Sequence, residues 1–197
     1  MIKAVIFDWG GVLIENPASE LMAYCASYLG TTSQKFTTTY LKYEKLFQKN
    51  QIAENELWRV ICAKLKVEVP KIKSLWGKAV KSVFRENKDV TAIALKLKES
   101  GYKIGFLSNT EIPTAKYFKK QSYNFFDVAV FSCFEGFVKP QQEIFEIILN
   151  KLKVKPEEAI FRKEHVEGAR RLGIQAILFK DAKHLMRDLK HLSIKLN

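Results

Sequence analysis

The chain has 197 residues, 47% of them hydrophobic, which is enough to bury one core without disulfide or metal staples. Its formal net charge of +12 would suit nucleic-acid binding, but the 33 Lys and Arg residues are scattered, and no basic motif interleaved with aromatics accompanies them. The composition therefore excludes a dedicated nucleic-acid-binding module and favours a lysine-rich solvated surface that steers small anions weakly.

The cysteines and the N-terminus bear on the compartment. Cys25, Cys62 and Cys133 show no CxxC spacing, so neither a disulfide framework nor a zinc site is predicted. The first apolar run is interrupted at Asp8, too early for a secretory signal, and no stretch approaches the length of a transmembrane helix. We expect a cytoplasmic protein without membrane contact and leave its oligomeric state open.

Five apolar runs predict the buried strands of a parallel sheet, because each is short, continuous and followed by polar residues. The runs are Lys3 to Phe7, Lys103 to Leu107, Asp127 to Phe131, Glu158 to Phe161 and Gln175 to Phe179. Helical patterns separate most of them. This alternation of strand and helix is typical of an α/β fold with a parallel sheet.

Several helix starts can be placed from local signals. Asp89 is predicted to cap a helix that ends before Gly101, and Pro113 and Pro140 are predicted in the first turns of two more helices. A further helix is expected from His165 to Leu172.

The interval from Pro17 to about Phe84 contains no strand-like run, and several amphipathic helical patterns occupy it. We predict a helical insertion of residues 17–85 in an α/β core of residues 1–16 and 86–197. Its aromatics are expected to form its own core. A ligand-binding face built on Trp58 or Trp76 is the alternative.

Polar residues follow the predicted strands where a parallel sheet binds its ligands, beyond the carboxyl ends. Asp8 ends the first strand, Ser108-Asn109-Thr110 ends the second, and Lys139 follows the third after a loop. A carboxylate nucleophile, a hydroxyl and amide pair, and a lysine together suit phosphoryl transfer. Taken singly, these residues also suit a turn, a helix cap and a surface lysine.

Three segments resemble, in order, the first three motifs of the haloacid dehalogenase-like (HAD) hydrolase superfamily, and a fourth resembles the segment that follows its fourth motif. They are Ile6 to Leu13, Phe106 to Thr110, Val138 to Pro140 and Val166 to Ile174. The resemblance spans essentially the whole chain. It implies a Rossmann-like parallel sheet with a helical cap inserted after the first motif.

The resemblance also implies roles for individual residues. Asp8 would attack phosphorus to give an aspartyl-phosphate, while Ser108 and Lys139 hold the phosphoryl oxygens. Magnesium would bridge Asp8 and the phosphate, with the Gly10 carbonyl in its shell. Further contacts to the substrate are expected from Gly11, Asn109 and Thr110.

The chain departs from the pattern at position 10. Most phosphatases of the superfamily carry a second Asp two residues after the nucleophile, as general acid and base, and here that residue is Gly10. Losing such a group typically removes about 10² to 10⁴ in rate. Glu15 and Glu111 are conceivable substitutes.

The second departure lies in the fourth motif, where metal-binding acids normally follow the strand. Here Phe161 runs directly into Arg162-Lys163-Glu164, and inserting Ile-Asp-Asp after Phe161 restores a family-like sequence. Either the deletion is genuine or loop residues are missing at this point, and we favour the second. Without those acids Asp8 should bind Mg²⁺ weakly. Glu164 is expected to cap the next helix rather than reach the site.

Three functions are compatible with these patterns. The first is a magnesium-dependent phosphatase of a small phosphorylated metabolite. The second is a catalytically silent scaffold that binds a metabolite or a protein. The third is a metal-independent carbon-halogen hydrolase. Its substrate carries a carboxylate, which would need a well-placed arginine as its partner, such as Arg59 or Arg85.

Overall fold

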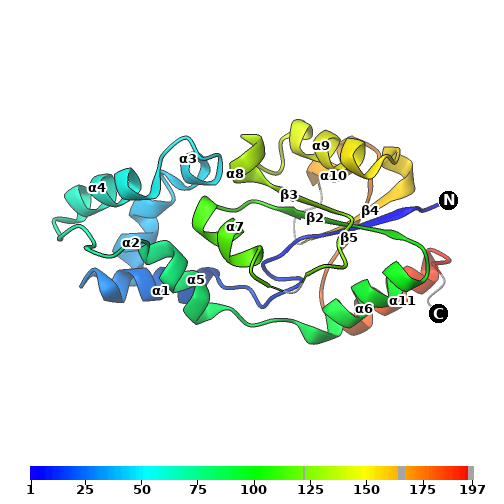
Figure 1. The fold of residues 1–197 in the computed structure, drawn as a ribbon, viewed down its shortest axis with the longest axis horizontal. Helices are drawn as coiled ribbons and strands as arrows, with labels where there is room; N and C mark the ends of the chain where they lie inside the picture. The colour runs from blue at the N-terminus through cyan, green and yellow to red at the C-terminus, as the bar shows by residue number, and fades with distance from the viewer. Residues whose placement is uncertain (122, 164–166, 195–197) are drawn as a thin grey trace.

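The computed structural model describes residues 1–121, 123–163 and 167–194. Its five strands form one parallel sheet in the order β3-β2-β1-β4-β5 (Figure 1). The strands are β1 (Ala4–Phe7), β2 (Lys103–Ser108), β3 (Val128–Phe131), β4 (Ala159–Lys163) and β5 (Gln175–Leu178). The predicted α/β fold with a parallel sheet is confirmed.

Helices fill the connections between the strands. Between β1 and β2 lie α1 (Ala18–Tyr28), α2 (Ser33–Tyr40), α3 (Glu44–Gln48), α4 (Glu54–Leu65), α5 (Leu75–Val83) and α6 (Lys88–Glu99). After β2 come α7 (Ile112–Phe118), α8 (Ser132–Glu135), α9 (Gln142–Leu152), the 3-10 turn η1 (Pro156–Glu158), α10 (Glu167–Arg171) and α11 (Ala182–His191).

Alternate residues of the central strands pack on opposite faces of the sheet, as the two-residue repeat of a strand requires. Val5 and Phe7 belong to a core shared with α6 and α11, whereas Ala4 and Ile6 belong to a core shared with α9 and α10. Figure 1 shows these two helix layers on either side of the strands. All four strand residues are fully buried, which explains why the run reads as continuously apolar.

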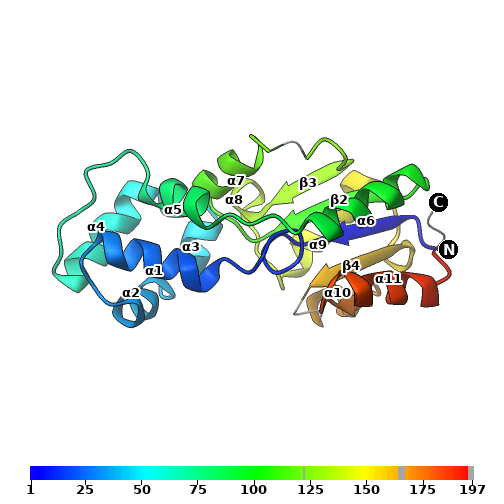
Figure 2. The ribbon, with the colours of Figure 1, turned by 90° about the horizontal axis from the view of Figure 1, so that it is seen from below.

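The five helices α1 to α5 lie beside the sheet rather than over it (Figures 1 and 2). The chain leaves the sheet after Ile14 and returns at Glu86, and these residues form an antiparallel bridge. The Glu15 N–H donates to the Arg85 carbonyl at 3.0 Å, and the Asn87 N–H donates to the Leu13 carbonyl at 2.8 Å. The outgoing and returning segments are thus hydrogen-bonded to each other. That residues 17–85 form a separate domain stays a prediction.

Two helix starts differ from the sequence prediction. Asn87, not Asp89, caps α6, because its side chain accepts a hydrogen bond from the Val90 N–H at 3.3 Å. Asp89 lies in the first turn of the helix. Pro140 precedes the N-cap of α9, Gln141, and so belongs to the loop before the helix. Pro113 does lie in the first turn of α7, as predicted.

The end of β4 also differs. The prediction that this strand ends at Phe161 is wrong, since Arg162 and Lys163 continue it and pair with Ile177 and Leu178 of β5. That residues are missing from the sequence after Phe161 stays a prediction. Residues 164–166, which include the predicted cap Glu164 and the start of the predicted helix, lie outside the described residues, and α10 begins at Glu167.

No helix within the described ranges combines the length and the apolar character needed to cross a bilayer.

Candidate active site

Asp8 and Lys139 form a buried ion pair at the carboxyl end of the sheet. Asp8 directly follows β1, and its Oδ1 lies 2.7 Å from Lys139 Nζ. The same oxygen accepts a hydrogen bond from the Trp9 N–H at 2.8 Å. The two side chains are only 6% and 4% exposed. A charge pair so deeply buried keeps both partners in place, because removing either leaves the other charge uncompensated.

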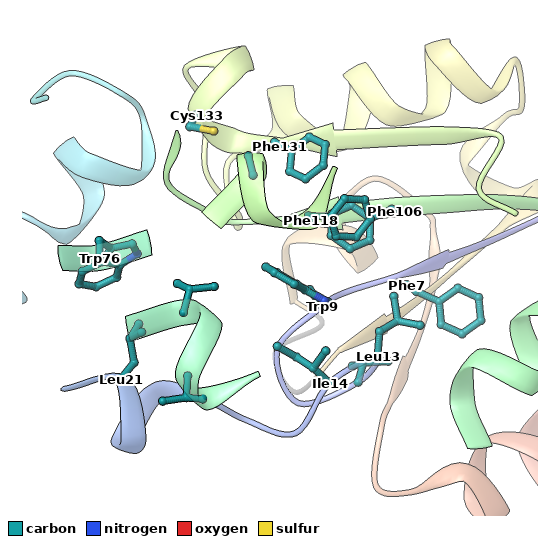
Figure 3. Close-up of a cluster of buried hydrophobic side chains, with 14 of the residues drawn as sticks. Phe7, Trp9, Leu13, Ile14, Leu21, Trp76, Phe106, Phe118, Phe131 and Cys133 are labelled. Atoms are coloured by element: carbon teal, nitrogen blue, oxygen red, sulfur yellow. The ribbon is translucent and has the colours of Figure 1, made fainter. Parts of the chain in front are cut away.

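The turn that carries Asp8 is anchored by an aromatic side chain. The Trp9 indole meets Phe118 edge to face, with ring centroids 5.4 Å apart, and also contacts Phe84 and Phe106 at 6.2 and 6.3 Å. Figure 3 shows Trp9 lying between the strands and the helices of the insertion. Such aromatic packing fixes the backbone on the C-terminal side of Asp8.

Lys139 is held from three directions. Its ammonium donates to the Leu107 carbonyl at 2.7 Å and lies 5.4 Å from the centre of the Phe161 ring. The Asn109 side chain bonds the Lys139 backbone twice, accepting from its N–H at 2.7 Å and donating to its carbonyl at 3.0 Å. Asn109 thus positions Lys139, and its predicted contact with substrate stays a prediction.

The residues around Asn109 lie at the end of β2, beside β1. Ser108 is buried, and its hydroxyl makes one long contact of 3.4 Å with the Asn109 carbonyl. The Thr110 N–H donates to Ser132 Oγ at 2.8 Å, and the Ser132 hydroxyl lies 2.7 Å from the Gln48 carbonyl of α3. Ser132, which the sequence analysis did not single out, therefore links the loop after β2 to the insertion.

The two glycines after Trp9 shape the turn. Gly11 has a φ of +76°, a conformation that a side chain would strain. At Gly10 the nearest atom to an added Cβ is Pro17 Cδ, at 3.4 Å. Gly10 lies at the wall of a pocket that Ser108, Asn109 and Thr110 also line. The structure therefore gathers the residues from β1 and β2 at one edge, with Lys139 paired to Asp8.

The described residues fit a strong magnesium site poorly. Within the described ranges no group of three or more His, Cys, Asp or Glu side chains is arranged to hold a metal. The strand beside β1 places Arg162 opposite Phe7, with Lys163 next, where the family pattern has acids. Mg²⁺ needs one or two carboxylates besides its waters. Of the predicted magnesium ligands, Asp8 and the Gly10 carbonyl, only Asp8 is an acid, and its carboxylate is already paired with Lys139.

A pocket of about 190 Å³ lies between the carboxyl end of the sheet and the helices of the insertion. Most of its wall is apolar. The side chains that form it are Trp9, Ile14, Pro17, Ala18, Leu21, Met22, Tyr40, Trp76, Val80, Val83 and Phe84, with Gly10 and the polar residues Glu44, Gln48, Ser108, Asn109, Thr110, Glu111 and Thr114. We refer to it below as the insertion pocket.

Glu111 is the most deeply buried acid of this pocket, at 6% exposure. Its carboxylate accepts hydrogen bonds from Thr114 Oγ1 at 2.8 Å, Trp76 Nε1 at 3.0 Å and the Tyr40 hydroxyl at 3.3 Å. Burial raises the pKa of Glu111, and these donors lower it by less. Burial together with Glu111 and Glu44 raises the pKa of Tyr40 well above its usual range.

The prediction that the insertion's tryptophans are core residues is confirmed, and a ligand-binding role for them stays a prediction. Trp58 and Trp76 are buried in the hydrophobic cluster that continues into the core of the sheet, with Trp76 stacked on Tyr40 at 4.8 Å. Trp76 also lines the insertion pocket. The sequence could not reveal this because the partner of its indole N–H, Glu111, lies on another element.

Six residues named as candidates do not line this pocket: Asp8, Gly11, Glu15, Arg59, Arg85 and Lys139. Glu15 is exposed and does not line the pocket, so of the two proposed substitutes for the absent acid only Glu111 does. Arg59 and Arg85 are exposed, and the Arg85 guanidinium donates to the carbonyls of Ser82 and Phe84.

Comparison with known proteins gives the family. The family model described as haloacid dehalogenase-like hydrolase matches residues 2–161. Among solved structures, the wild-type HAD family enzyme BT-2542 from Bacteroides thetaiotaomicron, in complex with magnesium and inorganic phosphate, is similar with a TM-score of 0.76 and 24% identity. The match covers 95% of this chain and 100% of that one. At this identity the likeness shows the fold.

Curated relatives carry several kinds of name, and a mouse acyl-CoA dehydrogenase family member 10 is 26% identical over 96% of this chain. Others are named as phosphatases. A sesquiterpene phosphatase of Aspergillus oryzae is 24% identical over 96% of both chains. A glyceraldehyde 3-phosphate phosphatase of Pyrococcus furiosus is 33% identical over 49% of this chain and 43% of its own length. The chain spans less than half the length of the first curated relatives that it matches, only 19% in one case.

Proposed function

Because the chain belongs to the haloacid dehalogenase-like hydrolases, we propose that it hydrolyses the phosphate monoester of a small metabolite through an aspartyl-phosphate on Asp8. The observation that carries the proposal is the buried ion pair at the carboxyl end of the sheet, in which Asp8 Oδ1 lies 2.7 Å from Lys139 Nζ. The phosphatase names of two relatives support it.

The chemistry follows from the placement of these groups. A carboxylate oxygen of Asp8 bonds to phosphorus while the ester P–O bond breaks and the alcohol oxygen leaves with the bonding electrons. Lys139 offsets the negative charge of the phosphoryl oxygens, and the Ser108 hydroxyl is the further donor at this edge. Water then cleaves the aspartyl-phosphate, which releases inorganic phosphate and regenerates Asp8.

The leaving oxygen must take its proton from another source than position 10, because Gly10 has no side chain. Esters of acidic alcohols, such as aryl phosphates, should therefore react faster than alkyl phosphates. We further propose that magnesium binds weakly here, since the acids of the fourth motif are absent from β4.

The decisive test is whether the purified protein hydrolyses the aryl ester 4-nitrophenyl phosphate, with and without magnesium. Asp8→Asn should reduce the rate by about 10³-fold or more, because it removes the nucleophile. Asp89→Asn, the same change on the exposed surface of α6, should leave it unchanged. Equal rates for Asp8→Asn and the wild type would overturn the proposal.

A silent scaffold is the second candidate, favoured by one observation: basic residues continue β4 where the family pattern has acids. It predicts that a phosphate mimic binds without any turnover across a broad panel of phosphate esters. Calorimetry with magnesium and a phosphate mimic, on the wild type and on Asp8→Asn, distinguishes the phosphatase from the scaffold. Tight binding of both ligands together that depends on Asp8 would favour the phosphatase. The haloacid alternative receives no support from the pocket, whose wall includes neither Arg59 nor Arg85.

A further inference from the structure

The insertion pocket, which adjoins Gly10 and Ser108 and would receive the leaving group in the proposed reaction, differs in charge from the molecule around it. The chain as a whole carries a net charge of +12, yet among the described residues the pocket wall includes no Lys or Arg and does include Glu44 and Glu111. The remaining wall is mainly aliphatic and aromatic. A second anionic group placed here would lose its hydration and meet carboxylates instead of a counterion, which is costly.

The size of the pocket sets a second limit. Its volume is about 190 Å³, and a cavity of about 150 Å³ is known to hold a benzene ring. Hydrogen bonds between the core and the insertion stabilise the wall, since the Glu111 carboxylate accepts from Trp76 of α5 and from Tyr40 of α2. The pocket therefore fits one ring, or an aliphatic group of similar bulk.

We infer that the substrate carries an uncharged, largely apolar leaving group of about the size of one substituted benzene ring, and that esters with a second anionic group are rejected. This inference rests on the proposed function. It adds to that proposal a class of substrate, the phosphate monoesters of uncharged alcohols or phenols, and it excludes bisphosphates, nucleotides and phosphorylated acids.

An isosteric pair of esters tests it, the uncharged 4-carbamoylphenyl phosphate and the anionic 4-carboxyphenyl phosphate. The carbamoyl ester should have a kcat/KM about tenfold or more above that for the carboxyl ester, because the amide keeps the shape but removes the charge. Equal values, or a preference for the carboxylate, would overturn the inference.

A charge introduced into the wall provides the complementary test. Met22 lines the pocket from α1, whereas its neighbour Ala23 is exposed. Met22→Lys should raise kcat/KM for the carboxyl ester relative to the amide ester by about tenfold, and Ala23→Lys should leave the ratio unchanged. If both variants shift the ratio equally, the discrimination arises from the overall field and not from the pocket.

A binding measurement separates this inference from the proposed function. The free phenols, 4-hydroxybenzamide and 4-hydroxybenzoate, report on the pocket without turnover through quenching of Trp76, with Trp76→Phe as the control. Preferential binding of the amide without hydrolysis of either ester would support the inference and overturn the proposed function. Asp8-dependent hydrolysis without discrimination would do the reverse.

Discussion

At the scale of the residue, the proposed hydrolysis is affected most by position 10, where Gly10 provides no side chain to transfer a proton. The backbone there leaves room for a Cβ, whose nearest neighbour would be Pro17 Cδ at 3.4 Å. An acid at this position is what the resemblance to the family implies for proton transfer. The variant Gly10→Asp therefore tests whether a proton donor is the only group that the site lacks for fast hydrolysis of alkyl phosphates.

Gly10→Asp should raise kcat for an alkyl phosphate by about 10²-fold, the usual contribution of a general acid. With 4-nitrophenyl phosphate the gain should be small, because that leaving group departs without a proton. Steady-state kinetics on the two esters measures the difference. Gly10→Ala is the control, and a similar gain from it would show that the effect arises from the backbone rather than from the carboxyl group.

Glu111 is the residue on which the wall of the pocket depends. Glu111→Ala should lower the free energy of unfolding by about 3 kcal/mol, because the buried Thr114 and Tyr40 hydroxyls lose their acceptor and Trp76 Nε1 keeps only Thr114 Oγ1. Glu111→Gln should cost about 1 kcal/mol or less, since an amide oxygen can accept from two donors while its NH₂ group faces the Tyr40 hydroxyl. Urea denaturation of both variants checks the contrast.

The same carboxyl group predicts a dependence of stability on pH. Its pKa in the folded protein lies above its ordinary value of 4.5, so the folded state holds the extra proton between the two values. Stability therefore falls as the pH rises through this window, and Glu111→Gln removes that slope. Asp127, whose pKa is lowered because hydrogen bonds from Lys98 and Ile104 outweigh its burial, acts in the opposite sense at lower pH.

At the scale of the element, β4 has the largest consequences for metal binding. The strand runs through Arg162 and Lys163 in register with β5. Inserting Ile-Asp-Asp after Phe161 would displace these basic residues from the strand and supply two carboxylates next to Asp8. Calorimetry should then show Mg²⁺ affinity increased by about tenfold or more. An insertion of Ile-Asn-Asn is the matched control, and equal affinity for both insertions would contradict the argument.

The contact between α10 and the Lys139 loop offers a second element to test. A Cβ on Gly168 would lie 2.8 Å from both the carbonyl oxygen and the Cβ of Pro140. Gly168→Ala should therefore shift the loop that carries Lys139 and lower kcat by about tenfold, because small displacements of a catalytic group are expensive. Gly101→Ala, which has no atom within 4 Å of the added Cβ and lies outside the Lys139 loop, should leave kcat unchanged although it strains a positive φ.

Much of the element level could be predicted from the sequence, because local signals decide it. The apolar runs locate all five strands, and the helical patterns predict that the interval from Pro17 to about Phe84 is helical, as α1 to α5 are. The errors arise where tertiary pairing overrides a local signal. Arg162 and Lys163 look like loop residues, but neighbouring β5 extends the strand over them. Asn87 and Asp89 are both good caps, and the geometry of the returning segment selects Asn87.

Less of the candidate site could be predicted from the sequence. The chain order of Asp8, Ser108 and Lys139 indicated a common edge, but not that Asn109 would bond the Lys139 backbone on both sides. Nor could the meeting of Glu111 with Trp76 and Tyr40 be predicted, because it depends on how the helical insertion packs against the core.

At the scale of the whole molecule, the charge of +12 should assist the capture of a dianionic ester. With 4-nitrophenyl phosphate as substrate, kcat/KM should fall several-fold between about 0.01 and 0.15 M salt, because the screening length shrinks from about 30 to 8 Å. Binding of the uncharged phenol 4-hydroxybenzamide should not change over this range. A kcat/KM that is independent of salt would show that the surface lysines play no part in capture.

The hydrogen bonds that join the outgoing and returning segments, between Glu15 and Arg85 and between Leu13 and Asn87, have a consequence for how the protein can be remodelled. Since the two ends already meet, the core requires of the intervening chain only that it begin and finish at neighbouring points. A foreign helical segment of different length, grafted between these ends, should therefore leave the turn that carries Asp8 in place, and in the proposed reaction it would change which alcohol is accepted.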